Sequence, residues 1–127
     1  MEIIMVTRLK NNFEYIRLIR ERINKTFPSW KEFLCEYEGL PNGAFGIAYK
    51  YNTIDIEFIK HKSDFELRIY KNNKYPSNFS WEKDIHKGII DSIPDMDPEW
   101  YCTPCVELVD FYINFLKERI DTFVWDE

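Results

Sequence analysis

The feature that most constrains the fold is an alternation of apolar with polar or small residues between Gly43 and Lys71. It occurs in three runs, GAFGIAYKY, TIDIEFIK and DFELRIYK. A period of two places successive side chains on opposite faces of a β-strand. The breaks between the runs, at Asn52 and at residues 61–64, are short, so consecutive strands are expected to be antiparallel. We therefore predict a three-stranded antiparallel β-meander over residues 43–71, with one apolar face and one polar face.

The first of these runs places small residues between its large ones. Ala44, Gly46 and Ala48 alternate there with aromatic and aliphatic side chains. Small residues inside a strand often mark a close approach by another part of the chain. We expect another element to lie close to the sheet at these positions.

Helical spacing precedes the meander. Residues 12–26, NFEYIRLIRERINKT, carry apolar side chains three or four positions apart, which is the spacing of one helix face. Asn11 followed by Glu14 has the N-cap and N3 pattern of a capping box. We predict a helix over residues 12–26, and residues 2–6 either extend it or form a short strand.

A second helix is predicted directly after Pro28. Ser29 and Glu32 form another capping-box pattern, and the apolar residues of WKEFLCEY are again three or four positions apart. We predict a short helix over residues 30–38.

The C-terminal half predicts two more helices. Ser80 is a candidate N-cap for an isoleucine-rich helix, and Pro94 and Pro98 keep residues 94–102 out of helix. The last helix, over residues 103–123, has only a narrow polar stripe. It is expected to lie buried between the meander and the first helix, or to meet a partner along part of its surface. The predicted fold class is α+β, a small meander covered by helices from both ends of the chain.

Length and composition indicate one domain. The chain has 127 residues, which predicts a single globular domain over 1–127. No apolar run approaches the roughly 20 residues of a membrane-spanning helix, and the start, MEIIMVTRLK, lacks the basic segment and cleavage site of a signal peptide. Three cysteines without repeated spacing do not describe a secreted disulfide framework. We predict a cytoplasmic protein without membrane contact.

Charge is distributed unevenly behind a net value of −5. Residues 1–34 carry seven bases and four acids, whereas residues 82–127 carry four bases and twelve acids. Phosphate-binding surfaces need the opposite sign, so nucleic-acid binding is not expected. A strongly acidic C-terminal third suits a basic protein partner, through steering and charge complementarity. The alternative is that the acids only keep the domain in solution.

Cys102, Thr103, Pro104 and Cys105 resemble the W-C-x-P-C motif of thioredoxins. With Thr103 at N-cap and Pro104 at N1, Cys105 would lie in the first turn of a helix, where amide dipoles stabilise a thiolate. A thioredoxin places its motif directly after a buried strand near the start of a domain, but only one helix follows here. We therefore interpret both cysteines as packing at a helix start, with a thiol redox centre as the alternative.

Metal and enzyme motifs are missing from the sequence. A zinc site needs about four ligands in matched pairs, whereas Cys35, His61 and His86 are isolated. The chain has no glycine-rich phosphate loop, no Gly-x-Ser-x-Gly elbow and no clustered His–carboxylate arrangement. We expect no catalytic residues, no bound metal and no cofactor.

Two acidic sets are candidates for binding a partner. One lies in a proline-stiffened segment with neighbouring aromatic anchors: Asp91, Asp95, Asp97, Glu99, Trp100 and Tyr101. The other, on the polar face of the meander, is Asp55, Glu57 and Glu66, beside Arg68. The alternatives are a solvated loop whose aromatic side chains fold under it, and cross-strand Glu–Arg pairing on the sheet.

In size, acidity and aromatic content the chain resembles bacterial immunity proteins of contact-dependent growth inhibition and other polymorphic toxin systems. The resemblance involves no motif, so it assigns no residue. It implies a non-enzymatic antitoxin that binds and neutralises a cognate, often basic, toxin domain such as a nuclease. The alternatives are a thiol redox or regulatory protein using Cys102 and Cys105, and a regulator that binds some other protein.

Overall fold

The computed structural model describes residues 6–39, 43–61, 64–93 and 103–126. It has the predicted α+β class. In chain order the elements are α1 (Asn12–Thr26), β1 (Lys31–Tyr37), β2 (Phe45–Tyr51), β3 (Ile54–His61), β4 (Asp64–Tyr70), the π-helix η1 (Trp81–His86), α2 (Lys87–Ser92) and α3 (Val106–Arg119).

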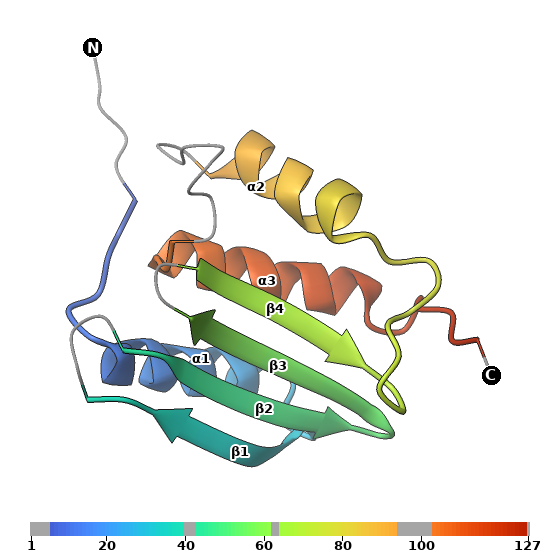
Figure 1. Cartoon of the computed structure of the whole chain (residues 1–127), viewed down its shortest axis with the longest axis horizontal. Helices are drawn as coiled ribbons and strands as arrows, with labels where there is room; N and C mark the ends of the chain where they lie inside the picture. The colour runs from blue at the N-terminus through green and yellow to red at the C-terminus, as the bar shows by residue number, and fades with distance from the viewer. Residues whose placement is uncertain (1–5, 40–42, 62–63, 94–102, 127) are drawn as a thin grey trace.

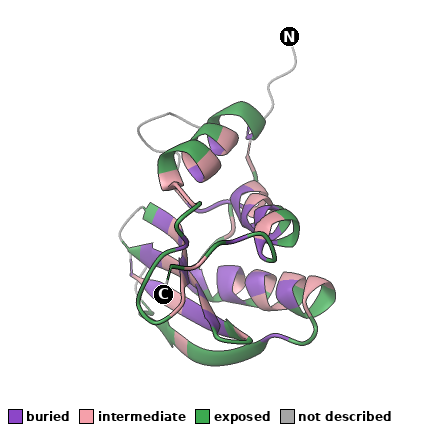
Figure 2. Cartoon of the chain, turned by 90° about the vertical axis from the view of Figure 1, so that its right-hand side faces the viewer, coloured by how far each residue is buried: buried purple, intermediate pink, exposed green. Residues whose placement is uncertain are grey.

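The four strands form one antiparallel sheet in the order β1-β2-β3-β4, so the meander has one strand more than predicted. Helices α1 and α3 lie on one face of the sheet, and α2 lies beside α3, beyond β4 (Figure 1). In the view from the side, no helix of the described chain covers the opposite face (Figure 2). The sheet therefore has a helix-covered face and an open face.

Strand β1 corrects the helix predicted over residues 30–38. It pairs with β2 along its length, with an irregularity in register between Glu32 and Leu34. The expected capping box does not form, because the Glu32 carboxylate accepts hydrogen bonds from the Arg20 guanidinium of α1 at 2.8 and 2.9 Å. The helical spacing of the apolar residues predicted the wrong element, because the apolar side chains of this strand do not form a buried helix face. Phe33, Leu34 and Tyr37 are all exposed.

Helix α1 begins where the capping pattern predicted. The Asn11 side chain accepts the N–H of Glu14 at 2.9 Å, and the Glu14 carboxylate accepts the N–H of Lys10 at 2.9 Å. The first bond satisfies a donor that a helix start leaves free. The second joins the residue before the N-cap to the first turn, whereas a full capping box would use the Asn11 N–H. Residues 2–5 lie outside the described part of the chain, and Val6 has no regular secondary structure.

Helix α3 is shorter at both ends than the predicted 103–123. Its N-cap is Cys105 rather than Thr103, and the Cys105 sulfur accepts the N–H of Leu108 at 3.3 Å. Pro104 stays outside the helix because its carbonyl faces the N-terminal segment. That carbonyl accepts hydrogen bonds from Arg8 Nη1 at 2.9 Å and from the Tyr15 hydroxyl at 3.0 Å.

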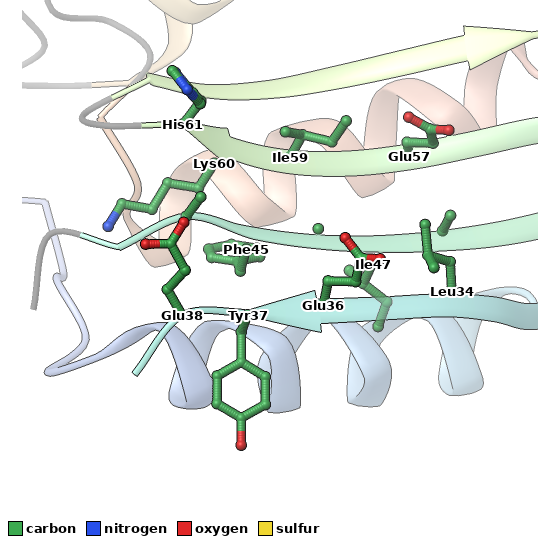
Figure 3. Close-up of a pocket in the computed structure, with 13 residues that line it drawn as sticks. Leu34, Glu36, Tyr37, Glu38, Phe45, Ile47, Glu57, Ile59, Lys60 and His61 are labelled. Atoms are coloured by element: carbon green, nitrogen blue, oxygen red, sulfur yellow. The ribbon is translucent and has the colours of Figure 1, made fainter. Parts of the chain in front are cut away.

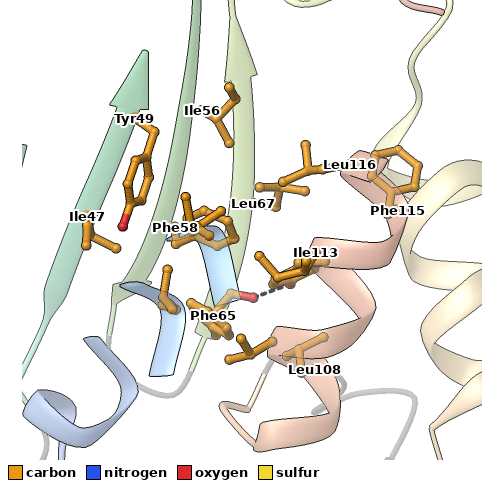
Figure 4. Packing of buried hydrophobic residues seen from close by; sticks show 14 of the residues in the cluster. Ile47, Tyr49, Ile56, Phe58, Phe65, Leu67, Leu108, Ile113, Phe115 and Leu116 are labelled. Atoms are coloured by element: carbon orange, nitrogen blue, oxygen red, sulfur yellow. Dashed lines mark hydrogen bonds between the residues drawn. The ribbon is translucent and has the colours of Figure 1, made fainter. Parts of the chain in front are cut away.

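The core fills the space between the sheet and the helices α1 and α3 (Figure 4). The large side chains of the alternating runs point into it, as predicted, and most of the apolar surface of α3 is buried there. The Tyr112 hydroxyl of α3 donates to the Phe65 carbonyl of β4 at 2.5 Å. Burial, rather than contact with a partner, therefore accounts for the apolar character of α3.

The helix predicted after Ser80 forms as η1 followed directly by α2. The Ser80 hydroxyl accepts the N–H of Lys83 at 3.4 Å, and the Asp84 carboxylate accepts the N–H of Ser80 at 2.7 Å. Gly88 lies inside α2, against the ring of Phe111 in α3. This contact holds the helical pair against α3.

Candidate protein-binding face

The open face of the sheet carries a groove of about 440 Å³ across β1, β2 and β3 (Figure 3). Its apolar lining includes Leu34, Ala44, Gly46, Ala48 and Ile59. The predicted close approach of another element is wrong at Gly46, where an added Cβ would meet nothing nearer than Ile59 Cγ1, 3.9 Å away. The small residues of β2 instead leave open space above the sheet.

Three carboxylates also line this groove. They belong to Glu36 of β1, Glu38 just after β1, and Glu57 of β3. None of the three has an ion-pair partner among the described residues. Burial raises the pKa of Glu57 above its ordinary value, and the charge of Arg68 opposes this only in part. Lys60 also lines the groove, but its Nζ donates to Asn12 Oδ1 at 3.0 Å and to the Gly43 carbonyl at 3.1 Å. A cation of a partner would therefore meet three carboxylates that form no ion pair within the described chain.

The remaining acids predicted on this face are already paired. Asp55 forms an ion pair with Lys50 across β2 and β3. Arg68 lies opposite Glu57 in register, but its ion pair is with Glu66 along β4, at 3.1 Å. The structure therefore brings Asp55, Glu57 and Glu66 together on one face, as predicted, and among the described residues only Glu57 of the three forms no ion pair.

The other predicted set is not on the sheet. Asp91 is exposed in α2, which lies beyond β4 rather than over the open face (Figure 1). Five of the predicted binding residues lie outside the described part of the chain: Asp95, Asp97, Glu99, Trp100 and Tyr101. Their role in binding stays a prediction.

The edge strand β1 is a feature that the sequence reasoning missed. Its Phe33, Leu34 and Tyr37 side chains are 50%, 43% and 55% exposed. Glu36 was missed with them, because the capping pattern was interpreted as the start of a helix. Apolar and polar residues do not alternate along KEFLCEY, so the sequence pattern gave no signal of a strand there.

The cysteine pair gains no support as a redox centre. Cys105 is fully buried, and its sulfur caps α3. Burial raises the pKa of the Cys105 thiol, which disfavours the reactive thiolate. Cys102 lies outside the described residues.

Within the described ranges, no group of three or more His, Cys, Asp or Glu side chains is placed to hold a metal ion. No helix in the same ranges combines the length and the apolar character needed to cross a membrane. No protein-family model, curated protein or solved structure matches the chain.

Proposed function

We propose that this chain is a non-enzymatic immunity protein that binds and neutralises a basic toxin domain, such as a nuclease, with its open sheet face. The observation that carries the proposal is the set of three carboxylates around the apolar groove, Glu36, Glu38 and Glu57, which are unpaired within the described chain. Such carboxylates steer a basic partner and select it over an acidic one.

The apolar part of the groove supports the same proposal. Carboxylates alone give fast but weak association, whereas stable interfaces need a desolvated apolar centre. Leu34 and Ile59 provide that surface beside the acids. The arrangement suits a partner that combines basic and apolar side chains.

A genetic experiment tests the proposed function. The gene directly upstream is expressed alone and together with this chain in a sensitive host. Growth arrest by the upstream product, relieved by this chain, supports immunity. A harmless upstream product, or toxicity that this chain does not relieve, contradicts it.

Charge reversal locates the binding surface. Glu36→Lys combined with Glu57→Lys is expected to weaken binding of that toxin by about tenfold per charge, mainly through slower association. Glu82→Lys combined with Glu118→Lys is the matched control, because the pair makes the same total change in charge at exposed sites on η1 and α3. Binding is measured by surface plasmon resonance at low and high salt, and added salt should narrow the difference.

The acidic segment 91–101 is tested in the same series. If reversal of Asp95, Asp97 and Glu99 weakens binding while reversal of Glu36 and Glu57 does not, the contact lies in that segment. The assignment to the sheet face would then be wrong, although the immunity function would stand.

A further inference from the structure

We infer that the partner contributes an extended segment, which pairs antiparallel with the outer edge of β1 as a fifth strand beside the acidic groove. This inference rests on the proposed function and specifies how the basic partner is held. The occupant is a protein segment in which basic residues alternate with apolar ones.

The two edges of the sheet differ. Beyond β4, the Tyr112 hydroxyl binds the Phe65 carbonyl, and Phe79 and Trp81 lie beside the strand. Beyond β1, the described chain places no further strand. Unpaired edges are sites at which another chain can add a strand.

The hydrogen-bond pattern between β1 and β2 identifies which backbone N–H and C=O groups of β1 point outwards and can pair with an added strand. Glu38 N–H donates to the carbonyl of Ala44 at 2.9 Å, so these opposed residues form a hydrogen-bonded pair. Such pairs alternate along antiparallel strands, which directs the backbone groups of Glu36 towards β2 and those of Cys35 and Tyr37 outwards. Two residues of β1 can therefore each exchange backbone hydrogen bonds with an added strand.

The side chains along the edge define the sequence of the added strand. On the helix-covered side, Tyr37 packs against Phe13 of α1 with ring centroids 6.1 Å apart, and both side chains are about half exposed. On the open side lie Leu34 and Glu36, at the wall of the groove (Figure 3). Apolar side chains of the added strand would extend the first surface, and its basic side chains would meet Glu36. Because successive side chains of a strand point to opposite faces, one added strand can place its apolar side chains on the first side and its basic side chains on the second.

Charge favours a basic strand over a second copy of β1. The strand and its continuation carry three glutamates, Glu32, Glu36 and Glu38, against one lysine, Lys31. Pairing of two copies would bring these acids together, and like charges on neighbouring strands are destabilising. A basic strand meets the same carboxylates with the opposite sign.

The edge is also held in place before binding. The two hydrogen bonds between Arg20 and Glu32 fasten the start of β1 to α1. Trp30, just before the strand, is buried and stacks on Phe27 with ring centroids 3.9 Å apart. A preformed edge reduces the ordering that binding would otherwise require.

The test uses the full chain, labelled with nitrogen-15, and a short capped peptide of alternating lysine and valine. We expect the peptide to bind and to slow hydrogen exchange of the Cys35 and Tyr37 amides by about tenfold or more. A peptide with the same side chains but N-methylated backbone amides should lose this binding, because it cannot donate to the edge. A peptide of alternating glutamate and valine should not bind.

Several outcomes would overturn the inference. Equal binding of the N-methylated peptide, without protection of Cys35 and Tyr37, would leave the acidic face as a binding surface but remove the added strand. If the lysine–valine peptide does not bind but the cognate toxin does, the added strand is rejected and the proposed function stands. If neither the peptide nor any toxin binds, both proposals are rejected. Protection of the two amides in a dimer without peptide would make a second copy the occupant.

A substitution in β1 provides an independent measurement. Cys35→Pro removes an outward N–H and leaves the bonds between β1 and β2 intact, since edge strands tolerate proline at such positions. It should abolish peptide binding, whereas Cys35→Ala, which changes only the side chain, should retain it. Equal binding by the two variants would contradict strand pairing. If Cys35→Pro does not fold, the N-methylated peptide decides the question on the native chain.

Discussion

At the scale of single residues, Glu57 is a carboxylate whose charge the fold opposes. Burial raises its pKa, so the folded state binds the proton more tightly than the unfolded state does. Stability from this group is therefore present at low pH and is lost as pH rises past the unfolded value of about 4.3 and through the folded pKa. Glu57→Gln should raise the free energy of unfolding at neutral pH, and this gain should disappear below about pH 4.

Urea denaturation over a range of pH measures the effect, with Glu118→Gln as the control at an exposed site. A Glu57→Gln variant that is less stable than the native chain at neutral pH would contradict the prediction. A basic partner would lower the pKa of Glu57, because a cation beside this side chain favours the charged carboxylate. Binding should accordingly release protons as the solution pH falls towards the folded pKa.

Cys105 provides the second prediction at this scale. Its sulfur is buried, accepts the Leu108 N–H, and has a raised thiol pKa. Iodoacetamide should therefore modify Cys105 only through opening of the fold, after Cys35, which is half-buried on the edge strand. Peptide mapping by mass spectrometry follows the two sites separately. Rapid modification of Cys105 in the native protein would restore the redox alternative.

At the scale of elements, the contact between α2 and α3 depends on Gly88. An added Cβ would lie 2.6 Å from Phe111 Cζ and 3.0 Å from Phe111 Cε2. Overpacking of this kind typically costs about 1–3 kcal/mol, more than the roughly 1 kcal/mol that alanine gains over glycine in a helix. Gly88→Ala should thus destabilise the native chain by about 1 kcal/mol.

The same substitution should become stabilising, by up to about 1 kcal/mol, in a Phe111→Leu background. There the ring is absent and only the helix propensity remains. A double-mutant cycle by chemical denaturation measures this change of sign. Equal effects in the two backgrounds would show that Phe111 does not restrict the site.

The comparison of β1 with its neighbours shows what the sequence could predict. Strands β2 to β4 were predictable because each buries one face. A strand with one buried face needs apolar residues at every second position, and this period of two is visible in the sequence. Strand β1 was not, because its side chains are exposed and its pattern carries no such constraint. Its state is decided by pairing with β2 and by Arg20 taking the Glu32 carboxylate, and both are tertiary interactions.

The candidate site was predictable to the same limited extent. Asp55, Glu57 and Glu66 could be placed on one face, since strand alternation alone determines that. Which of them lacks a partner could not be predicted, because Arg68 faces Glu57 in register yet binds Glu66. The groove is also lined by residues of β1. Because β1 was predicted as a helix, this side of the groove could not be predicted.

At the scale of the whole molecule, arginines of the basic N-terminal part form ion pairs within the chain. Arg20 pairs with Glu32 and Arg22 pairs with Asp110, each at 2.8 Å, and both pairs fasten α1 to a neighbouring element. These arginines therefore do not neutralise the groove. Within the described chain, carboxylates that form no ion pair remain on the open face, beside the exposed edge strand β1.

This arrangement predicts how pH governs self-association. At neutral pH the carboxylates along β1 oppose pairing of two copies, as like charges on an edge strand do. Near the isoelectric point of about 5.1 the net charge of the whole chain approaches zero, so the repulsion between copies weakens, and the exposed edge should then mediate association. Leu34→Lys should suppress it by adding a charge on the edge, whereas Val124→Lys, the same change in charge at an exposed apolar site outside the sheet, should not. Sedimentation velocity at pH 7 and near pH 5 measures the difference. Equal association of the two variants at the lower pH would mean that net charge, rather than the edge of β1, governs self-association.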